Sequence, residues 1–234
     1  MANENHLIIL EKGIETWNKW REEHPEIVYP HLENARLSGK DFRNGNFINA
    51  RFYGADLRDV DFRNAKFKNV DFMMADLAHA KFNGAILDGP IFHTCDLSFA
   101  DFDNTVIEDG VFTNSDMEST SLIGATLLNE PRFIYARLRN AKMQGITLHK
   151  ANFYGAFLEN ANLEGAKMKA TNLSLSTLVN TNLANADFSN SKVYGISAWN
   201  LNLSNTVQDD LIISKEDESL ITVSDIKLRS LYIS

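Results

Sequence analysis

Carboxylates are the residues of this sequence with the most evident capacity for chemistry. Between Lys81 and Arg132 the chain contains no Lys or Arg, whereas the segments on both sides are net basic. The stretch carries nine acidic residues: Asp88, Asp96, Asp101, Asp103, Glu108, Asp109, Asp116, Glu118 and Glu130. A concentration of like charge attracts a partner of opposite sign over a long range. The pattern is therefore typical of a surface that receives a basic partner.

Catalytic and metal-binding patterns do not occur in the sequence. The motifs G-x-S-x-G, Walker A and G-x-G-x-x-G are all missing. The six histidines do not share the spacing of metal ligands: His6, His24, His31, His79, His93 and His149. Ser and Asp are plentiful, but the repeat described next requires them. We therefore expect no enzymatic activity, no cofactor and no bound metal.

A bulky apolar residue returns at every fifth position, and this repeat must position the carboxylates. In the segment 50–97 these residues are Phe52, Leu57, Phe62, Phe67, Phe72, Leu77, Phe82, Leu87, Phe92 and Leu97. A small or compact residue usually lies two positions before each, and Asn or Gly commonly lies two positions after. A period of five fits neither the 3.6 of a helix nor the 2 of a strand. A fixed internal repeat of this kind determines the fold.

A second period of twenty residues is superimposed on the first. It sorts the bulky residues into series: Leu37, Leu57, Leu77, Leu97 and Met117; Phe42, Phe62, Phe82 and Phe102; Phe52, Phe72, Phe92 and Phe112. If each five-residue unit is an extended segment plus a turn, four units close a square coil. Stacked coils then bring residues twenty apart into contact. Asn and Gly suit the turns because they tolerate left-handed backbone.

The sequence resembles the pentapeptide repeat family, whose pattern is A-(D/N)-L-x-x. Matching stretches are Ala55-Asp56-Leu57, Ala75-Asp76-Leu77, Ala161-Asn162-Leu163 and Ala186-Asp187-Phe188. The resemblance implies an all-β solenoid, a right-handed quadrilateral β-helix. Some members of the family imitate duplex DNA with an acidic rod and bind DNA gyrase or topoisomerase. This sequence differs from them, because its acidic residues form a belt between basic ends and no long loop interrupts the repeat.

The repeat divides the chain into three parts. We expect residues 1–30 to form an N-terminal capping α-helix, spanning about 5–23, and the entry to the solenoid. Its apolar stripe is Leu7, Leu10, Ile14 and Trp17, its cap is Asn3 or Asn5, and it covers the open end of the first coil. We expect residues 31–206 to form the β-helix. A one-residue stutter falls near 128–132, because Phe133 follows Leu127 by six positions.

Residues 207–234 are expected to form a C-terminal cap or linker with short strand and helix elements. Two short strands, 211–213 and 220–223, flank a polar turn from Ser214 to Ser219, and a helix begins at Asp225. A similar segment leads into a further signalling or effector domain in some bacterial members of the family. The tail is therefore either a cap or a link to a further domain of a longer protein.

Stacking of the coils predicts which carboxylates lie side by side. Asp56, Asp76, Asp96 and Asp116 fall in one outward column, where neighbours about 5 Å apart repel by roughly 1 kcal/mol in water. Arg58 offsets this repulsion beside Asp56. The matching positions near Asp76, Asp96 and Asp116 are Ala78, Ser98 and Glu118, so we expect the compensation to vanish toward the middle of the column. The candidate partner-binding carboxylates are Asp76, Asp96, Asp101, Asp103, Glu108, Asp116 and Glu118. The alternative is that Asp serves only turns and solubility at these positions.

Apolar residues occupy neighbouring outward positions that are polar elsewhere in the repeat. Ile86 and Val106 share one column, and Ile91 and Val111 share the adjacent one. Ordinary β-propensity explains such residues when they are scattered. A contiguous outward group more often marks an interface. We therefore add these four residues to the candidate partner-binding set.

Composition limits the compartment and the class of partner. The chain has 234 residues, a formal net charge of −8, a pI of about 5.2 and one cysteine, Cys95, at an inward small-residue position. An acidic chain is not expected to bind nucleic acid directly. No signal peptide or membrane span is evident, so we expect a cytoplasmic protein. The leading hypothesis is a scaffold for a protein partner, with a possible homodimer. The alternatives are a DNA mimic that binds gyrase or topoisomerase and the sensing part of a longer effector protein.

Overall fold

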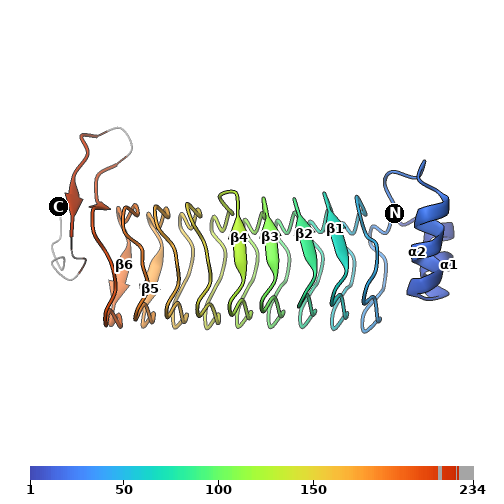
Figure 1. The fold of residues 1–234 in the computed structure, drawn as a ribbon, viewed down its shortest axis with the longest axis horizontal. Coiled ribbons are helices and arrows are strands. Elements are labelled where there is room, and N and C mark those ends of the chain that lie inside the picture. Colours follow the sequence, from blue (N-terminus) through green and yellow to red (C-terminus); the bar gives the residue numbers. More distant parts are fainter. Residues whose placement is uncertain (216–217, 225, 227–234) are drawn as a thin grey trace.

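The protein is an elongated rod of coils stacked along one axis (Figure 1). The computed structural model describes residues 1–215, 218–224 and 226. Two helices lie at the N-terminal end of the stack and a short hairpin lies at the C-terminal end (Figure 1). The expected all-β solenoid is confirmed, and its repeating unit is the five-residue repeat seen in the sequence.

Each coil has four faces because four columns of parallel backbone bridges run along the rod. Before the stutter, the bridges join residues twenty positions apart. We identify each face by the first bridge of its column. Face A begins with His31–Arg51, face B with Arg36–Asp56, face C with Asp41–Asp61 and face D with Asn46–Lys66. Because the bridges supply backbone hydrogen bonds between coils, every extended segment except those of the end coils pairs on both sides.

The bridges lengthen into regular strands on two faces. On face D, β1 (Lys66–Lys68), β2 (Ile86–Asp88), β3 (Val106–Glu108) and β4 (Thr126–Leu128) form a parallel sheet in that order. On face B, β5 (Thr177–Val179) pairs in parallel with β6 (Ser197–Trp199). Each strand of face D points its middle residue inward, as in Phe67, Leu87 and Ile107.

Phenylalanine rings stacked from coil to coil form the centre of the core. Phe52, Phe72, Phe92 and Phe112 follow one another with ring centroids 5.0–5.2 Å apart. The series continues past the stutter to Phe133 and Phe153, at 4.8 and 4.6 Å. All six rings are fully buried. Stacked and edge-on ring contacts add to the stabilisation from buried area, so the rod has a solid apolar core along these coils.

The corners between faces require left-handed backbone. Asn64 (φ 60°) and Gly84 (φ 70°) are typical of a corner position that recurs at five-residue intervals with φ near +60°. Asn is the residue found most often at these positions besides Gly, which agrees with its tolerance of this region. The sequence pattern of Asn or Gly after each bulky residue is therefore explained by the corners.

The extra residue after Leu128 is accommodated at the corner between faces D and A. Val111 bridges Arg132, so the register becomes 21 residues at this point and returns to 20 with Arg132–Asn152. Asn129 (φ 60°) and Glu130 (φ 57°) are both left-handed, which adds one residue to the corner. The coils on either side remain stacked, since Phe112 and Phe133 lie in contact.

The N-terminal cap consists of two helices, not the one helix expected over 5–23. α1 spans Glu4–Glu11 and α2 spans Ile14–Glu23. Gly13 separates them with φ of 107°, a conformation outside the helical region that glycine adopts without steric cost. Asn3 caps α1 as expected, because its side-chain oxygen accepts hydrogen bonds from the backbone N–H groups of Asn5 and His6.

The cap covers the first coil through Trp17 and its neighbours on α2. Trp17 is fully buried, packs on Phe47 with ring centroids 5.8 Å apart, and donates a hydrogen bond from Nε1 to the backbone oxygen of Asn46. Asn18 donates to the backbone oxygen of Asn44 and accepts from the backbone N–H of Asn46. These contacts satisfy backbone groups that no preceding coil could pair.

The C-terminal tail forms the two short strands expected from the sequence. β7 (Leu211–Ile212) pairs antiparallel with β8 (Thr222–Val223), and the hairpin extends beyond the outline of the coils (Figure 1). Ile212 also bridges Lys192, so β7 continues face A. The helix expected from Asp225 falls almost entirely outside the described residues.

Replacement of Phe72 by Asp is expected to lower the free energy of unfolding by several kcal/mol. The change places a carboxylate with no cationic partner inside the column of stacked rings, where ionised groups are poorly solvated. Urea denaturation followed by circular dichroism measures the loss. Asn114→Asp, at an exposed left-handed corner, is the matched control and should be nearly neutral. A Phe72→Asp protein as stable as the control would show that the ring does not face the core.

Deletion of residues 1–24 is expected to cause end-to-end association of the rods. The truncation exposes Phe47 and the unpaired backbone groups of the first coil, which form a template for pairing with a second chain. Light scattering at several protein concentrations measures the association. Trp17→Ala should give a weaker form of the same effect. A truncated chain that stays monomeric and equally stable would contradict the capping role.

Candidate interaction surface

The structure distributes the candidate carboxylates over three faces of the rod. Face B carries Asp76, Asp96, Asp116 and Glu118; face C carries Asp101 and Asp103; and face D carries Glu108. All seven side chains are half-buried or exposed. They lie in adjacent coils, so together they form a band around part of the rod. We call this set of residues the acidic belt.

The aspartate column of face B is neutralised at both ends but not in its middle. Parallel bridges join Asp56, Asp76, Asp96 and Asp116 in register, as the sequence predicts. Arg58 lies 2.7 Å from Asp56 and also reaches Asp76 in the next coil at 3.3 Å. The expectation that compensation is lost at Asp76 and Asp116 is therefore wrong, because long arginine side chains pair across coils.

Arg137, which follows the stutter, neutralises the other end of the column. Its Nη1 atom lies 3.5 Å from Oδ2 of Asp116. Asp96 accepts hydrogen bonds only from the backbone N–H and hydroxyl of Ser98 among the contacts described. Partial burial, with the neighbouring carboxylate of Asp96, raises the pKa of Asp76 even though Arg58 is close. The repulsive part of the column is thus centred on Asp96.

Neutral donors hold the two carboxylates of face C. Asp101 accepts hydrogen bonds from Nδ2 of Asn83 at 2.7 Å and from the backbone N–H of Asp103. Asp103 accepts from the hydroxyl of Ser121 at 2.6 Å and from the backbone N–H of Ile123. These bonds orient the carboxylates without cancelling their charge. Face C therefore remains negative in these coils.

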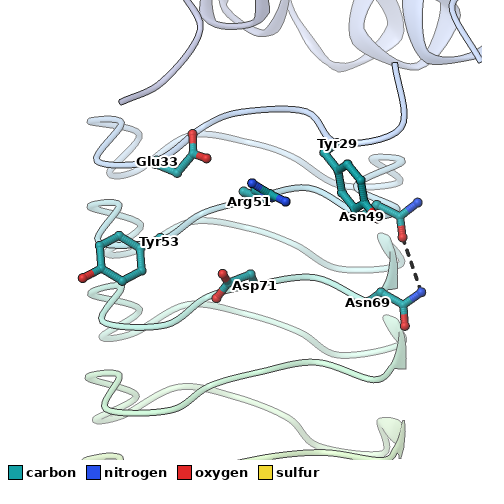
Figure 2. A pocket seen from close by; sticks show the side chains of 7 residues that line it. All are labelled: Tyr29, Glu33, Asn49, Arg51, Tyr53, Asn69 and Asp71. Carbon is teal, nitrogen blue, oxygen red and sulfur yellow. Dashed lines mark hydrogen bonds between the residues drawn. The ribbon is translucent and has the colours of Figure 1, made fainter. Parts of the chain in front are cut away.

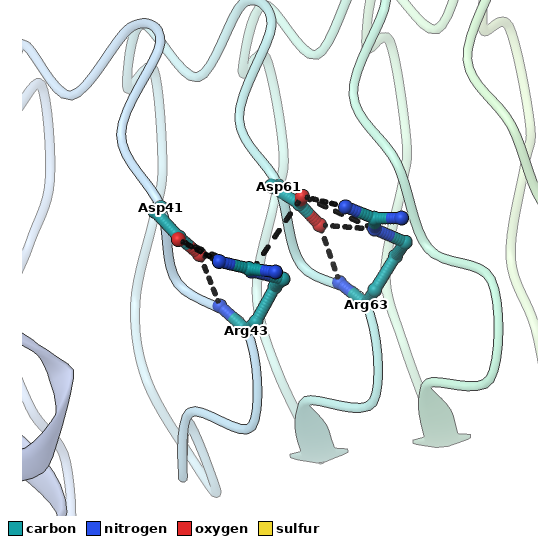
Figure 3. Close-up of polar contacts among 4 residues, drawn as sticks. All are labelled: Asp41, Arg43, Asp61 and Arg63. Atoms are coloured by element: carbon teal, nitrogen blue, oxygen red, sulfur yellow. Dashed lines mark hydrogen bonds and ion pairs between the residues drawn. The ribbon is translucent and has the colours of Figure 1, made fainter.

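Towards the N-terminus the same face is neutral because aspartate and arginine alternate. Asp41 binds Arg43 and Asp61 binds Arg63 through hydrogen bonds as short as 2.6 Å (Figure 3). Arg43 also approaches Asp61 of the next coil at 3.9 Å. The side-chain hydrogen bonds from the arginines lower the pKa of both carboxyls. The contrast with Asp101 and Asp103 shows that the belt on face C lacks counter-charges that the same face has nearer to the N-terminus.

The four candidate apolar residues form two pairs on two adjacent faces. Ile86 pairs with Val106 on face D, and Ile91 bridges Val111 on face A. Ile86, Val106 and Ile91 expose 62%, 46% and 38% of their surface, and Val111 is half-buried. Asp88 and Glu108 lie between the pairs along the chain, so the two pairs meet at an acidic corner.

Bulky residues at strained corners extend the apolar surface beyond the expected residues. Met74 (φ 58°) and Tyr135 (φ 55°) occupy the corner between faces A and B and expose about half of their surface. Left-handed backbone is unfavourable for such side chains. The sequence held a signal for them, since both stand where the repeat usually has Asn or Gly. Because Met74 and Tyr135 are exposed and strain the backbone, packing alone does not explain them.

Two pockets lie on face A away from the acidic belt. The first, of about 400 Å³, is lined by Tyr29, Glu33, Asn49, Arg51, Tyr53, Asn69 and Asp71 (Figure 2). The ring of Tyr29 covers the guanidinium of Arg51 at 4.7 Å. The second, of about 510 Å³, lies beside the C-terminal hairpin and includes Tyr154 and Tyr194.

Cys95 lies in the core, away from the surface of the rod. Cys95 is buried and its Sγ donates to the backbone oxygen of Phe72 at 2.8 Å, and burial raises the pKa of this thiol to about 12. Among the residues that the structure describes, no three His, Cys, Asp or Glu side chains are placed to hold a metal ion. No helix within these residues is long and apolar enough to cross a membrane.

The comparison with solved structures matches the chain to pentapeptide repeat proteins. HetL from the cyanobacterium Nostoc sp. strain PCC 7120, involved in heterocyst differentiation regulation, is 20% identical over 86% of this chain and 97% of its own, with a TM-score of 0.42. QnrB1, a plasmid-mediated fluoroquinolone resistance protein, is 20% identical over 75% of this chain and 85% of its own, with a TM-score of 0.49. Rfr23 from the cyanobacterium Cyanothece 51142 is 20% identical over 83% of this chain and 99% of its own, with a TM-score of 0.23.

The family assignment rests on the repeats themselves. The search among curated proteins found no match to the chain. The model of pentapeptide repeats matches eight copies, in residues 31–64, 55–93, 95–127, 132–169 and 158–195. These segments include most of the bridged coils described above. The chain belongs to the pentapeptide repeat family.

Proposed function

We propose that this chain is a non-catalytic scaffold that binds a protein partner through the acidic belt and the adjacent apolar pairs. One observation carries the proposal. The exposed Ile91 and the half-buried Val111 lie in the same two coils as Asp96 and Glu108, two carboxylates with no ion pair among the described residues. Apolar burial supplies affinity in protein interfaces, and complementary charge supplies specificity and rate of encounter.

The energetic cost of this surface also supports a role in binding. Stacked coils place like charges in register, and bulky side chains at left-handed corners add strain of about 1–3 kcal/mol each. Elsewhere arginines lie beside Asp41 and Asp61, and Asn or Gly occupies most corners, although Leu175 is also an exposed left-handed residue. Features that lower stability at one place are typical of sites kept for function.

A DNA mimic that binds gyrase or topoisomerase is the second candidate. The carboxylates of faces B, C and D favour it, because they form a continuous negative band over these coils. Face A of the same coils has no charged side chain between Asp71 and Arg132. A duplex presents phosphates around its full circumference. The scaffold therefore fits the distribution of charge better than the mimic does.

Mutation of the two parts of the surface is expected to separate these candidates. Ile91→Ser/Val111→Ser should abolish binding to the partner that co-purifies with the chain, because most of the affinity comes from apolar burial. Asp96→Asn/Asp101→Asn/Asp103→Asn should weaken it less and reduce its dependence on salt. Pull-down at several salt concentrations, with quantification of the bound partner, measures both effects.

A gyrase supercoiling assay completes the comparison. The scaffold predicts no effect of the wild-type chain on gyrase at stoichiometric amounts. Ile123→Ser, an exposed apolar position on face C, is the matched control for the apolar variant and should bind as wild type does. Loss of binding in the acidic triple variant alone, with perturbation of gyrase by the wild type, would replace the scaffold with the mimic.

Met74→Asn is expected to raise stability while it weakens binding. Asn tolerates the left-handed corner that strains Met, so the free energy of unfolding should increase by about 1 kcal/mol. The loss of an exposed apolar side chain at the corner between faces A and B should lower affinity for the partner. Chemical denaturation and pull-down measure the two effects in the same samples. Ile91→Asn, at an extended position, should weaken binding with no gain in stability. A Met74→Asn protein that is less stable would show that the corner is not strained.

A further inference from the structure

The centre of face A is a strip without Asp, Glu, Lys or Arg, in which outward apolar side chains lie beside the polar His93, Thr94, Thr113 and Asn114. Along the rod it is bounded by Asp71 and Arg132, and in between face A contributes residues 72–75, 91–95 and 111–115, with no Asp, Glu, Lys or Arg. Its exposed apolar side chains are Met74 and Ile91, with Val111 half-buried and Tyr135 at the far end. We call this part of face A the apolar strip.

Acidic residues flank the strip on both sides. In one coil the chain passes from Asp88 at the end of β2, across Ile91 on face A, to Asp96 on face B. In the next coil it passes from Glu108 and Asp109, across Val111, to Asp116. The two flanks therefore run parallel to the rod axis, with the apolar strip between them.

In each of the two coils, one flank is neutralised by an ion pair and the other is not. Lys68 neutralises Asp88 at 2.7 Å, and Arg137 lies 3.5 Å from Asp116. Among the described residues, no cationic group lies within 4.0 Å of the carboxylates of Asp96, Glu108 or Asp109. Unneutralised charge thus remains on each side of the centre of the strip.

We infer that the apolar strip binds a basic amphipathic α-helix of the partner protein, an inference that rests on the scaffold proposed above. The apolar stripe of such a helix covers Met74, Ile91 and Val111. Lys or Arg side chains at both edges of the stripe reach the carboxylates of the two flanks, as their long aliphatic stems allow. Recognition of an amphipathic helix through apolar residues at helical spacing is a common mode of peptide binding.

The dimensions of the strip suit one helix lying along the rod. The three extended residues of one face span about 10 Å, close to the helix diameter of about 10–12 Å. Three coil-to-coil steps from Asp71 to Arg132 cover about 14 Å, which corresponds to roughly ten residues of helix. A helix of three turns therefore matches both the width and the length of the uncharged region.

Charge argues against a second copy of this chain as the occupant. Each copy has a net charge of −8, and the strip is flanked by carboxylates on both sides. Two copies joined through the strip would bring like charges together, which disfavours association. An extended peptide would place only alternate side chains on the strip and could not direct cations to both flanks in the same way.

The test measures binding of stapled helical peptides of about 14 residues, a length of four turns. The first peptide has a Leu stripe with Lys at both edges. The second replaces Lys with Glu, and the third has the composition of the first in an alternating order. Fluorescence anisotropy with the full chain should show the first peptide binding at least tenfold more tightly than either control. Circular dichroism of each protein variant confirms that it is folded.

Variants of the chain locate the binding. Ile91→Ser/Val111→Ser should weaken the first peptide at least tenfold. Asp96→Asn/Glu108→Gln should weaken it several-fold and reduce its salt dependence. Glu164→Gln/Ile123→Ser, on face C and outside the acidic belt, is the matched control and should have no effect. The inference would be overturned if the alternating peptide bound as tightly as the first peptide. It would also be overturned if the face C control lost as much affinity as Ile91→Ser/Val111→Ser.

Other outcomes separate this inference from the proposed scaffold. If the co-purifying partner requires Ile91 and Val111 but the first peptide does not bind, the scaffold stands and the helical occupant is wrong. If sedimentation shows a dimer of the chain that Ile91→Ser/Val111→Ser dissociates, a second copy occupies the strip and the inference is also wrong. If neither partner nor peptide depends on these residues, both proposals fail.

Discussion

Parallel backbone bridging between successive coils is the constraint on which the rest of this structure depends. Each face repeats its hydrogen bonds every twenty residues, or 21 at the single stutter. A shift of one residue would turn the buried rings of Phe72 and Phe92 outward, so the register is fixed by the burial of the core. The inserted residue near Glu130 is tolerated because it lies at a corner, where it changes no inward position.

The same constraint determines the properties of the surface. A residue type that recurs every twenty positions becomes a column with neighbours about 4.8 Å apart. Aspartates in such a column must be interleaved with cations or must repel one another. The chain uses the first solution near Asp41 and Asp61 and leaves the column open at Asp96. The acidic belt is therefore a local departure from a rule that the rod otherwise follows.

Sequence reasoning predicted the core and the faces because the five- and twenty-residue periods follow directly from the geometry of the coil. The inward Phe and Leu columns, the left-handed corners and the two strands of the tail all lie where the pattern places them. The break in the N-terminal helix was not predicted, although Gly13 was its visible signal. The helical stripe from Leu7 to Trp17 continues across the break, and periodicity alone does not report a left-handed glycine.

The ion pairs between coils show where the sequence was not sufficient. Arg58 reaches Asp76, and Arg137 reaches Asp116, because arginine side chains are longer than the distance between coils. Reading charges one position at a time assigns each arginine to its own coil and misses these contacts. The same reasoning missed Met74 and Tyr135, whose importance depends on the backbone conformation at the corner. The acidic belt itself could be located from sequence, but its neutralised ends could not.

Methyl NMR of the chain with its co-purifying partner tests most directly whether face A is the binding surface. Ile91 and Val111 report on face A, Ile86 and Val106 on face D, and Ile123 on face C. We expect the methyl signals of Ile91 and Val111 to shift or broaden most, those of Ile86 and Val106 less, and that of Ile123 not at all. Perturbation centred on Ile123, with Ile91 and Val111 unchanged, would contradict the account and place the partner on the opposite face of the rod.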